Sequence, residues 1–178
     1  MLRIDHRESH DVDIFLSDPQ LLPFLDPQKR DFQFEIRPAD NEGDGSSFQK
    51  FVFKDVGEID FIVGHAMTPS PTTQATIEGE ATLLETMPEI ITKKIYYRGS
   101  SIKPRDIFDI AAAGEQHADS VIEALQLYRN EVEKTLMTID KLNPDFVNRA
   151  IAQLSIKDKF RSVAKTALQQ TKELLRAV

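Results

Sequence analysis

The period of the hydrophobic pattern changes once along this chain, near residue 87, and that change limits the folds open to it. Before this point, six short segments either alternate apolar with polar residues or are rich in β-branched and aromatic residues, as strands are. The last two flank a turn at Gly79 and predict a hairpin, and a short helix or turn is expected at 18–25. The six expected strands are 11–16, 32–36, 48–54, 58–63, 75–77 and 81–84.

Beyond residue 87 the apolar residues recur at spacings of three and four, which is the period of an α-helix. Pro88 stands in a first turn, where proline is favoured, and Gly99 follows as a stop signal. Gly114 predicts the end of a second helix in the same way. The expected helices are 88–98, 105–113, one with an apolar stripe from 121 to 139, 144–154 and 157–177.

Strands followed by helices predict an α+β fold. We expect a small mixed β-sheet core in residues 1–87, followed by a C-terminal helical bundle in residues 88–178. No glycine-rich phosphate loop stands at a strand-to-helix junction, so a Rossmann or P-loop site is not expected.

The composition is that of a folded protein, with 40% hydrophobic and 29% charged residues. The lack of cysteine excludes disulfides and fits a reducing cytoplasm, and no apolar window is long enough to span a membrane, so we expect a cytoplasmic protein. The formal charge is −7, yet residues 155–178 hold six basic residues against two acidic ones, an excess of four. The last helix is therefore either a surface for a polyanion or protein partner, or an ordinary solvated face.

Two aspartates stand at alternate positions of the first expected strand. Asp11 and Asp13 therefore project from the same face, where their oxygens could share a divalent cation such as Mg²⁺. Another expected strand presents Glu58 and Asp60 on one face, and as a neighbouring strand it could supply a third carboxylate. A cation would relieve the repulsion between such close charges. The alternative is a solvated polar face on an edge strand.

Cationic and acidic side chains recur on the two helices that follow. Lys94 and Arg98 lie four apart and share a helix face from which both could reach phosphate. Asp106 and Asp109 lie three apart and share a face near a helix N-terminus, which favours negative charge. The alternative is an aspartate that caps the helix and pairs with Arg105.

Three segments, taken in order, resemble the AbiEii/AbiGii family of nucleotidyltransferase toxins. The segment 7–14 has the pattern Arg-x-Ser-x-Asp-Val-Asp-Ile, 88–98 has Pro-Glu-Ile-Ile before Lys94 and Arg98, and 105–109 is Arg-Asp-x-x-Asp. The resemblance covers about residues 7–115. Its later part is the more specific, because a lysine helix is rarely followed so closely by Arg-Asp-x-x-Asp.

The resemblance implies a polymerase-β-like nucleotidyltransferase core that moves a nucleotide from a nucleoside triphosphate to an acceptor such as RNA, with Mg²⁺ as cofactor. Relatives are bacterial and are neutralised by a cognate antitoxin, so an antitoxin-like protein is an expected partner. The implied metal ligands are Asp11, Asp13 and Asp60. The implied catalytic set is Asp13, Lys94, Asp106 and Asp109. The implied nucleotide contacts are Lys94, Arg98 and Arg105.

One motif of the family is missing: a Gly-Gly or Gly-Ser turn upstream of the paired aspartates, which holds the triphosphate. Residues 2–5 stand in its place. Either the chain is a shortened form of the protein, or its nucleotide site has lost this part and the protein acts by binding a partner protein or RNA. His6 and His10 lie near Asp11, and we expect both histidines to be incidental to any site.

Overall fold

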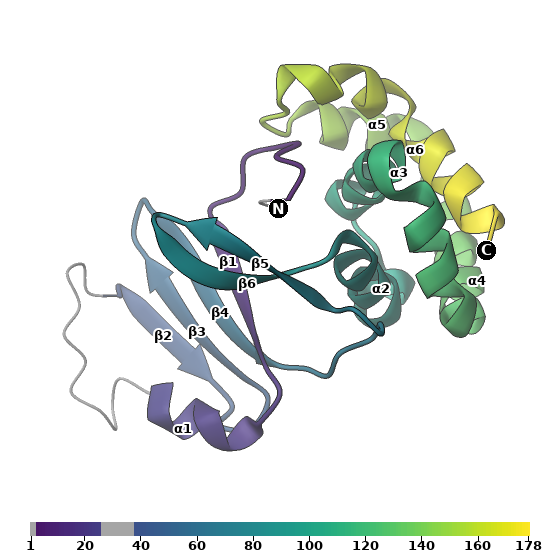
Figure 1. Cartoon of the computed structure of the whole chain (residues 1–178). Helices are drawn as coiled ribbons and strands as arrows, with labels where there is room; N and C mark the ends of the chain where they lie inside the picture. The colour runs from purple at the N-terminus through teal and green to yellow at the C-terminus, as the bar shows by residue number, and fades with distance from the viewer. Residues whose placement is uncertain (1–2, 26–37) are drawn as a thin grey trace. The chain divides into compact units, whose positions relative to one another are not determined.

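The computed structural model describes residues 3–25 and 38–178 and divides the chain into two compact units. The sheet unit is Ser9–Ala66, and the helical unit joins Met1–Glu8 to Met67–Val178. Figure 1 traces both, and the expected strand at 32–36 lies outside the described residues. The mixture of sheet and helices confirms the α+β fold class.

The sheet unit has four strands among its described residues, in the order β1-β4-β3-β2. β1 is parallel to β4, and the pairs β4–β3 and β3–β2 are antiparallel, so the sheet is mixed, as expected. A 3₁₀ turn (Pro19–Leu21) and the short α1 (Leu22–Leu25) follow β1. The strands are β1 (Asp11–Leu16), β2 (Asp40–Gly43), β3 (Phe48–Phe53) and β4 (Gly57–Val63).

A glycine at the start of β4 allows β1 to lie beside it. Gly57 has φ of 150°, and a Cβ there would clash with the backbone carbonyl of His10. The Glu58 amide donates to that same carbonyl oxygen at 3.3 Å. This close approach starts a register in which Asp13 lies opposite Asp60.

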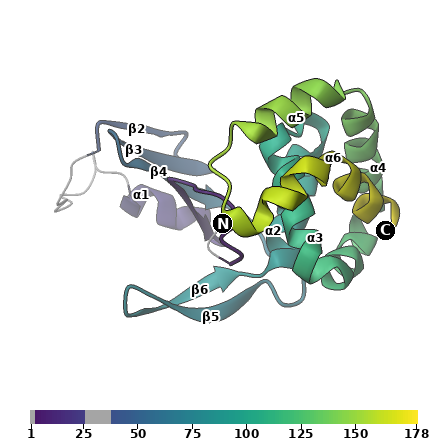
Figure 2. The ribbon, with the colours of Figure 1, turned by 90° about the horizontal axis from the view of Figure 1, so that it is seen from above.

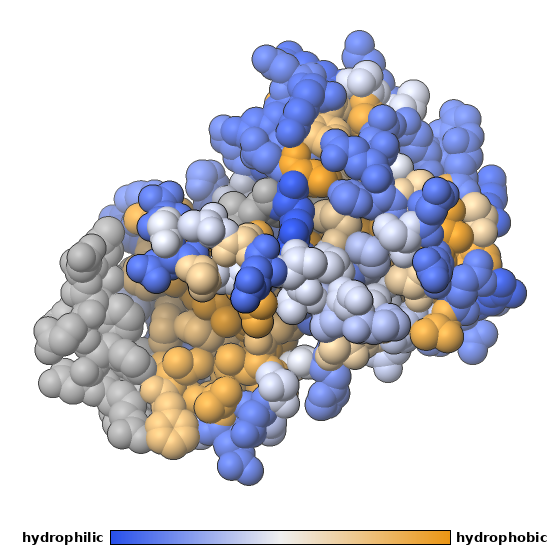
Figure 3. Space-filling view, in the orientation of Figure 1, coloured by the Kyte–Doolittle hydropathy of each residue, from blue (hydrophilic) through white to orange (hydrophobic). Residues whose placement is uncertain are grey.

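The two faces of this sheet differ in polarity. Val12 and Ile14 on β1 share the apolar face with Phe51 and Phe61, whose ring centroids are 5.6 Å apart. Val12 and Ile14 are half-exposed, and Figure 3 shows hydrophobic side chains gathered over the sheet. The alternate positions of β1, which carry the aspartates, project from the opposite face.

The helical unit is built around α3, which packs against α2, α5 and α6. Its core is apolar and includes the fully buried Ile91, Ile107 and Phe108. Figure 2 shows the hairpin β5–β6 extending away from the helices. No helix of residues 3–25 or 38–178 has the length and apolarity that crossing a membrane needs. The elements are β5 (Thr72–Ile77), β6 (Glu80–Glu85), α2 (Met87–Arg98), α3 (Pro104–Leu125), α4 (Arg129–Asp140), α5 (Pro144–Ala152) and α6 (Arg161–Arg176).

The helix break expected at Gly114 lies instead at His117, whose φ of −133° and ψ of 20° are not helical and kink α3 before it continues to Leu125. A Cβ at Gly114 would lie 2.8 Å from Leu174 Cδ1, so this glycine serves the close packing of α6 on α3. The apolar stripe expected on one helix is instead divided between α3 and α4 by a 3₁₀ turn, Gln126–Tyr128. At this turn the Tyr128 hydroxyl donates to the Met67 carbonyl oxygen at 2.8 Å.

The boundary expected near residue 87 differs from the observed division, since residues 3–8 and the β5–β6 hairpin belong to the helical unit. Arg3 accounts for part of this, because its guanidinium donates to the carbonyl oxygens of Leu84 and Glu85 at 2.6 and 2.8 Å. The Glu8 amide donates to the Ser155 carbonyl oxygen at 3.0 Å. Both contacts join the start of the chain to segments far along it.

Candidate functional site

The sheet unit carries an acidic face, made of Asp11 and Asp13 on β1 and Glu58 and Asp60 on β4. Because the strands are parallel and in register, Asp11 lies opposite Glu58 and Asp13 opposite Asp60. Both β1 aspartates are exposed to solvent. The structure therefore brings together the three carboxylates predicted as metal ligands on one face of one sheet.

A lysine on the third strand partly neutralises this face. Lys50 Nζ lies 2.6 Å from Glu58 Oε2 and 3.5 Å from Asp60 Oδ1. Burial raises the pKa of Asp60, and the charge of Asp13 adds to that rise, while Lys50 opposes it. Asp60 Oδ1 is buried and accepts no hydrogen bond from the described residues. Asp60 is thus a carboxylate whose ionised form is incompletely compensated.

The acidic face fits a hard divalent cation in its donor chemistry, because it offers carboxylate oxygens and one of them lacks a hydrogen bond. In the part of the chain that the structure describes, no three His, Asp or Glu side chains are grouped closely enough to hold a metal ion as they stand. A cation on this face would therefore draw on the exposed Asp11 and Asp13 first.

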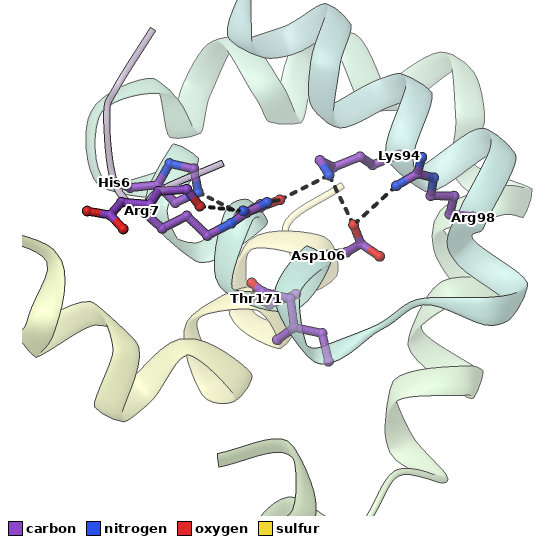
Figure 4. Close-up of polar contacts among 9 residues, drawn as sticks. His6, Arg7, Lys94, Arg98, Asp106 and Thr171 are labelled. Atoms are coloured by element: carbon purple, nitrogen blue, oxygen red, sulfur yellow. Dashed lines mark hydrogen bonds and ion pairs between the residues drawn. The ribbon is translucent and has the colours of Figure 1, made fainter. Parts of the chain in front are cut away.

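The helical unit holds a second polar group around Asp109, which is fully buried. Figure 4 draws its polar contacts and labels His6, Arg7, Lys94, Arg98 and Asp106. Asp109 accepts from His6 Nε2 at 2.6 Å and from Arg7 Nε and Nη2 at 2.7 and 3.1 Å. Lys94 Nζ lies 3.0 Å from Asp109 Oδ2, the oxygen that also accepts from Arg7 Nη2. Burial by itself would raise the pKa of Asp109, but the hydrogen bonds from His6 and Arg7 and the charge of Lys94 outweigh it and hold that pKa well below its ordinary value. The carboxylate is therefore ionised and can only accept, so His6 Nε2 carries a proton.

Asp106 links the same lysine to the beginning of α3. Its carboxylate accepts the Lys103 amide at 3.2 Å and lies 3.0 Å from Lys94 Nζ, while Arg98 stands 3.9 Å away. The helix-capping alternative is therefore correct for Asp106, but its cationic partners are Lys94 and Arg98. Arg105 is exposed on the first turn of α3 and makes no ion pair with other described residues.

We name this group of charged side chains the Asp109 cluster. Its members are His6, Arg7, Lys94, Arg98, Asp106 and Asp109. The cations Arg7, Lys94 and Arg98 surround the carboxylates Asp106 and Asp109. Arg98 is 46% exposed and Lys94 only 14%, so Arg98 presents its charge to solvent.

Sequence reasoning missed His6, which was expected to be incidental and is instead fully buried against Asp109. His10 is exposed, as a histidine without a role would be. Arg7 stood in the first segment of the resemblance, but its pairing with a residue 102 positions away gave no local signal. The nearest hint in the sequence is that both basic residues of 1–10 other than histidine are arginines, because arginine is the usual cation of buried ion pairs.

An exposed aromatic side chain lies beside the cationic residues of α2 and was not predicted. Tyr97 is 55% exposed and follows Lys94 by three positions, so the two share a helix face with Arg98. Its ring meets that of Tyr96 edge to face, with centroids 5.0 Å apart. The face of α2 near its C-terminus thus combines cations with an accessible ring.

No protein-family model, curated protein or solved structure matches this chain. The function must therefore be inferred from the acidic face and the Asp109 cluster.

We predict that Asp109→Asn lowers the free energy of unfolding at pH 7 by about 3–5 kcal/mol, because it leaves buried cations without their partner. Since the folded pKa of Asp109 is depressed, its contribution is complete above the ordinary value of 3.8 and declines as the pH falls below it. Urea unfolding at several pH values measures both effects. The variant should lose less stability on acidification than the native chain does.

The matched control is Asp119→Asn, an exposed carboxylate on the same helix. It should change stability by less than about 0.5 kcal/mol. Equal, small effects of the two substitutions would show that the Asp109 cluster does not stabilise the helical unit.

Proposed function

We propose that this chain is a nucleotidyltransferase of the toxin type, which uses Mg²⁺ to transfer a nucleotide from a nucleoside triphosphate to an acceptor such as RNA. The observation that carries the proposal is the register of β1 and β4, which puts Asp11, Asp13 and Asp60 on one face with the first two exposed. Paired carboxylates of this kind suit a hard cation bound to phosphate oxygens.

In this proposal Asp11 and Asp13 hold Mg²⁺, with Asp60 as a third ligand. The ion would neutralise charge on the phosphates during transfer. Asp13 and Asp11 are accessible for this, whereas Asp60 would first have to weaken its contact with Lys50. The raised pKa of Asp60 agrees with a carboxylate that gains from a nearby cation.

Within the helical unit, the residues to which the resemblance assigns nucleotide contacts belong mostly to the Asp109 cluster. Arg98 is the exposed cation that would contact phosphate directly, and Lys94 is the second cation, held by Asp106 and Asp109 at 3.0 Å from each of them. Arg105 would add a further exposed cation on α3. Such fixed charges stabilise a transferring phosphoryl group without reorganising during the reaction.

A second candidate function is partner binding without catalysis, with an antitoxin-like protein or RNA as the partner. It is favoured by the burial of Asp106 and Asp109, which are 1% and 0% exposed and already paired with Lys94. These pairs stabilise the helices whether or not a nucleotide binds. Activity measurements separate the two candidates.

The first activity test is transfer of label from an α-labelled nucleoside triphosphate to RNA, with and without Mg²⁺. We predict that Asp13→Asn lowers the transfer rate by at least about 100-fold, because the metal loses a charged ligand. Asp18→Asn is the matched control, since asparagine preserves the cap at which Asp18 accepts the Gln20 amide. A folded Asp13→Asn variant with unchanged transfer would overturn the metal role.

Tyr97 gives a separate prediction, because an exposed ring beside phosphate-binding cations can stack on a nucleobase. Tyr97→Ala should weaken nucleoside triphosphate binding by about 5- to 150-fold, the range expected for one stacked base. Binding of inorganic tripolyphosphate, which has no base, should not change. Tyr97→Phe should keep native affinity for both ligands in calorimetry, and a parallel loss of both in Tyr97→Ala would contradict stacking.

A further inference from the structure

A polar groove of about 500 Å³ lies along α6 and reaches α5, well apart in sequence from the Asp109 cluster. Its basic residues are Lys165, Lys172 and Arg176, and Glu173 is its one acidic residue. Asn148 on α5 adds a side-chain amide. Its other lining residues are Thr166, Leu168 and Gln169. We name this feature the α5–α6 groove.

The three basic residues and Gln169 form a row on one side of α6. Lys165, Gln169, Lys172 and Arg176 follow one another at spacings of four, three and four, which places them on one helix face. At 1.5 Å of rise per residue the row is about 16 Å long. A row of this length presents several cations to one extended ligand.

The packing of α6 fixes the direction of this row. Val163, Ala167 and Leu174 on the other side of the helix are buried in the core. Thr171 is also buried, where its hydroxyl donates to the Ile107 carbonyl oxygen at 2.7 Å. Rotation of α6 would expose these side chains, so the basic row stays at the surface.

The three cations of the groove differ in how close a counter-ion lies. Lys172 Nζ is held by Asp140 Oδ1 at 2.6 Å, and this contact lowers the pKa of Asp140. The charge of Arg176 also lowers the pKa of Asp140, whereas Lys165 forms no ion pair with the described residues. Glu173 accepts a hydrogen bond from Gln169 at 2.8 Å. The three cations therefore outnumber the two nearby carboxylates, Glu173 and Asp140, by one, although the chain as a whole carries −7.

The lining distinguishes between a nucleic acid and a protein as the ligand. Protein interfaces are centred on aromatic and apolar side chains, and this groove is lined by none except Leu168, which is partly buried. Lysine, arginine, threonine, asparagine and glutamine are the side chains that contact phosphate and sugar. The lining therefore matches a phosphodiester backbone.

We propose that the α5–α6 groove binds the backbone of RNA. Lys165, Lys172 and Arg176 contact successive phosphates, and the carboxylate of Glu173 accepts from a ribose 2′-hydroxyl, which DNA lacks. DNA has no 2′-hydroxyl to donate to Glu173, so the carboxylate of Glu173 would only repel the phosphates of a DNA backbone. The groove thus favours RNA over DNA without reading sequence.

This binding does not depend on nucleotidyl transfer, because it uses residues outside the acidic face and the Asp109 cluster and needs neither Mg²⁺ nor nucleotide. The two proposals can fail separately. A chain without transferase activity can still bind RNA in this groove, and an active one can fail to do so.

The test is fluorescence anisotropy with a short labelled single-stranded RNA and DNA of the same sequence, over a series of salt concentrations without nucleotide. The variant is Lys165→Gln/Arg176→Gln, which spares the Lys172–Asp140 pair. The control, Arg129→Gln/Lys134→Gln, removes the same charge from the exposed side of α4. Circular dichroism of each variant confirms folding.

We expect the native chain to bind RNA more tightly than DNA. The groove variant should lose about tenfold or more in RNA affinity at low salt, and its slope of log affinity against log salt should be shallower by about 1.4, or 0.7 for each lost phosphate contact. The control should keep the native slope. Absence of RNA binding, equal binding of DNA, or equal losses in variant and control would each overturn the proposal.

Discussion

The arrangement of the helical unit depends on one buried carboxylate. Asp109 is fully buried and ionised, and a buried charge is tolerated only where cations and hydrogen-bond donors surround it. His6, Arg7 and Lys94 fill that requirement, which joins the start of the chain, α2 and α3 at one point. Residues 3–8 are thereby fixed to helices that follow about a hundred positions later. The sheet unit is inserted in the sequence between Glu8, whose amide donates to the Ser155 carbonyl oxygen, and Met67, whose amide donates to the Glu89 carboxylate.

The same constraint gives the α2 surface its chemical character. Lys94 is held by two carboxylates, so its ammonium group has a defined position but little charge of its own to offer. Arg98 is the more exposed of the two cations and lies next to the exposed Tyr97. In the sheet unit, considered by itself, Asp11 and Asp13 form no ion pair with other described residues.

Local patterns predicted the elements well, because alternation along β1 and the proline and glycine signals of α2 act within a few residues. They also grouped Asp11 with Asp13 and Lys94 with Arg98, since both pairings follow from helix or strand geometry. The helix break expected at Gly114 occurs at His117, and Gly114 itself contacts Leu174 of a distant helix. His6 and Arg7 were missed for the same reason: their partner, Asp109, lies more than a hundred residues away, and no local period encodes that pairing.

The central claim, that Asp11 and Asp13 form a metal-dependent nucleotide site, is tested most directly by calorimetry. Each nucleoside triphosphate is titrated into the native chain and into Asp11→Asn/Asp13→Asn, with Mg²⁺ and with the metal removed by a chelator. The account predicts binding to the native chain that requires Mg²⁺ and is lost in the folded double variant. Binding that is equal in both chains, or a folded native chain that binds no nucleotide, would contradict it.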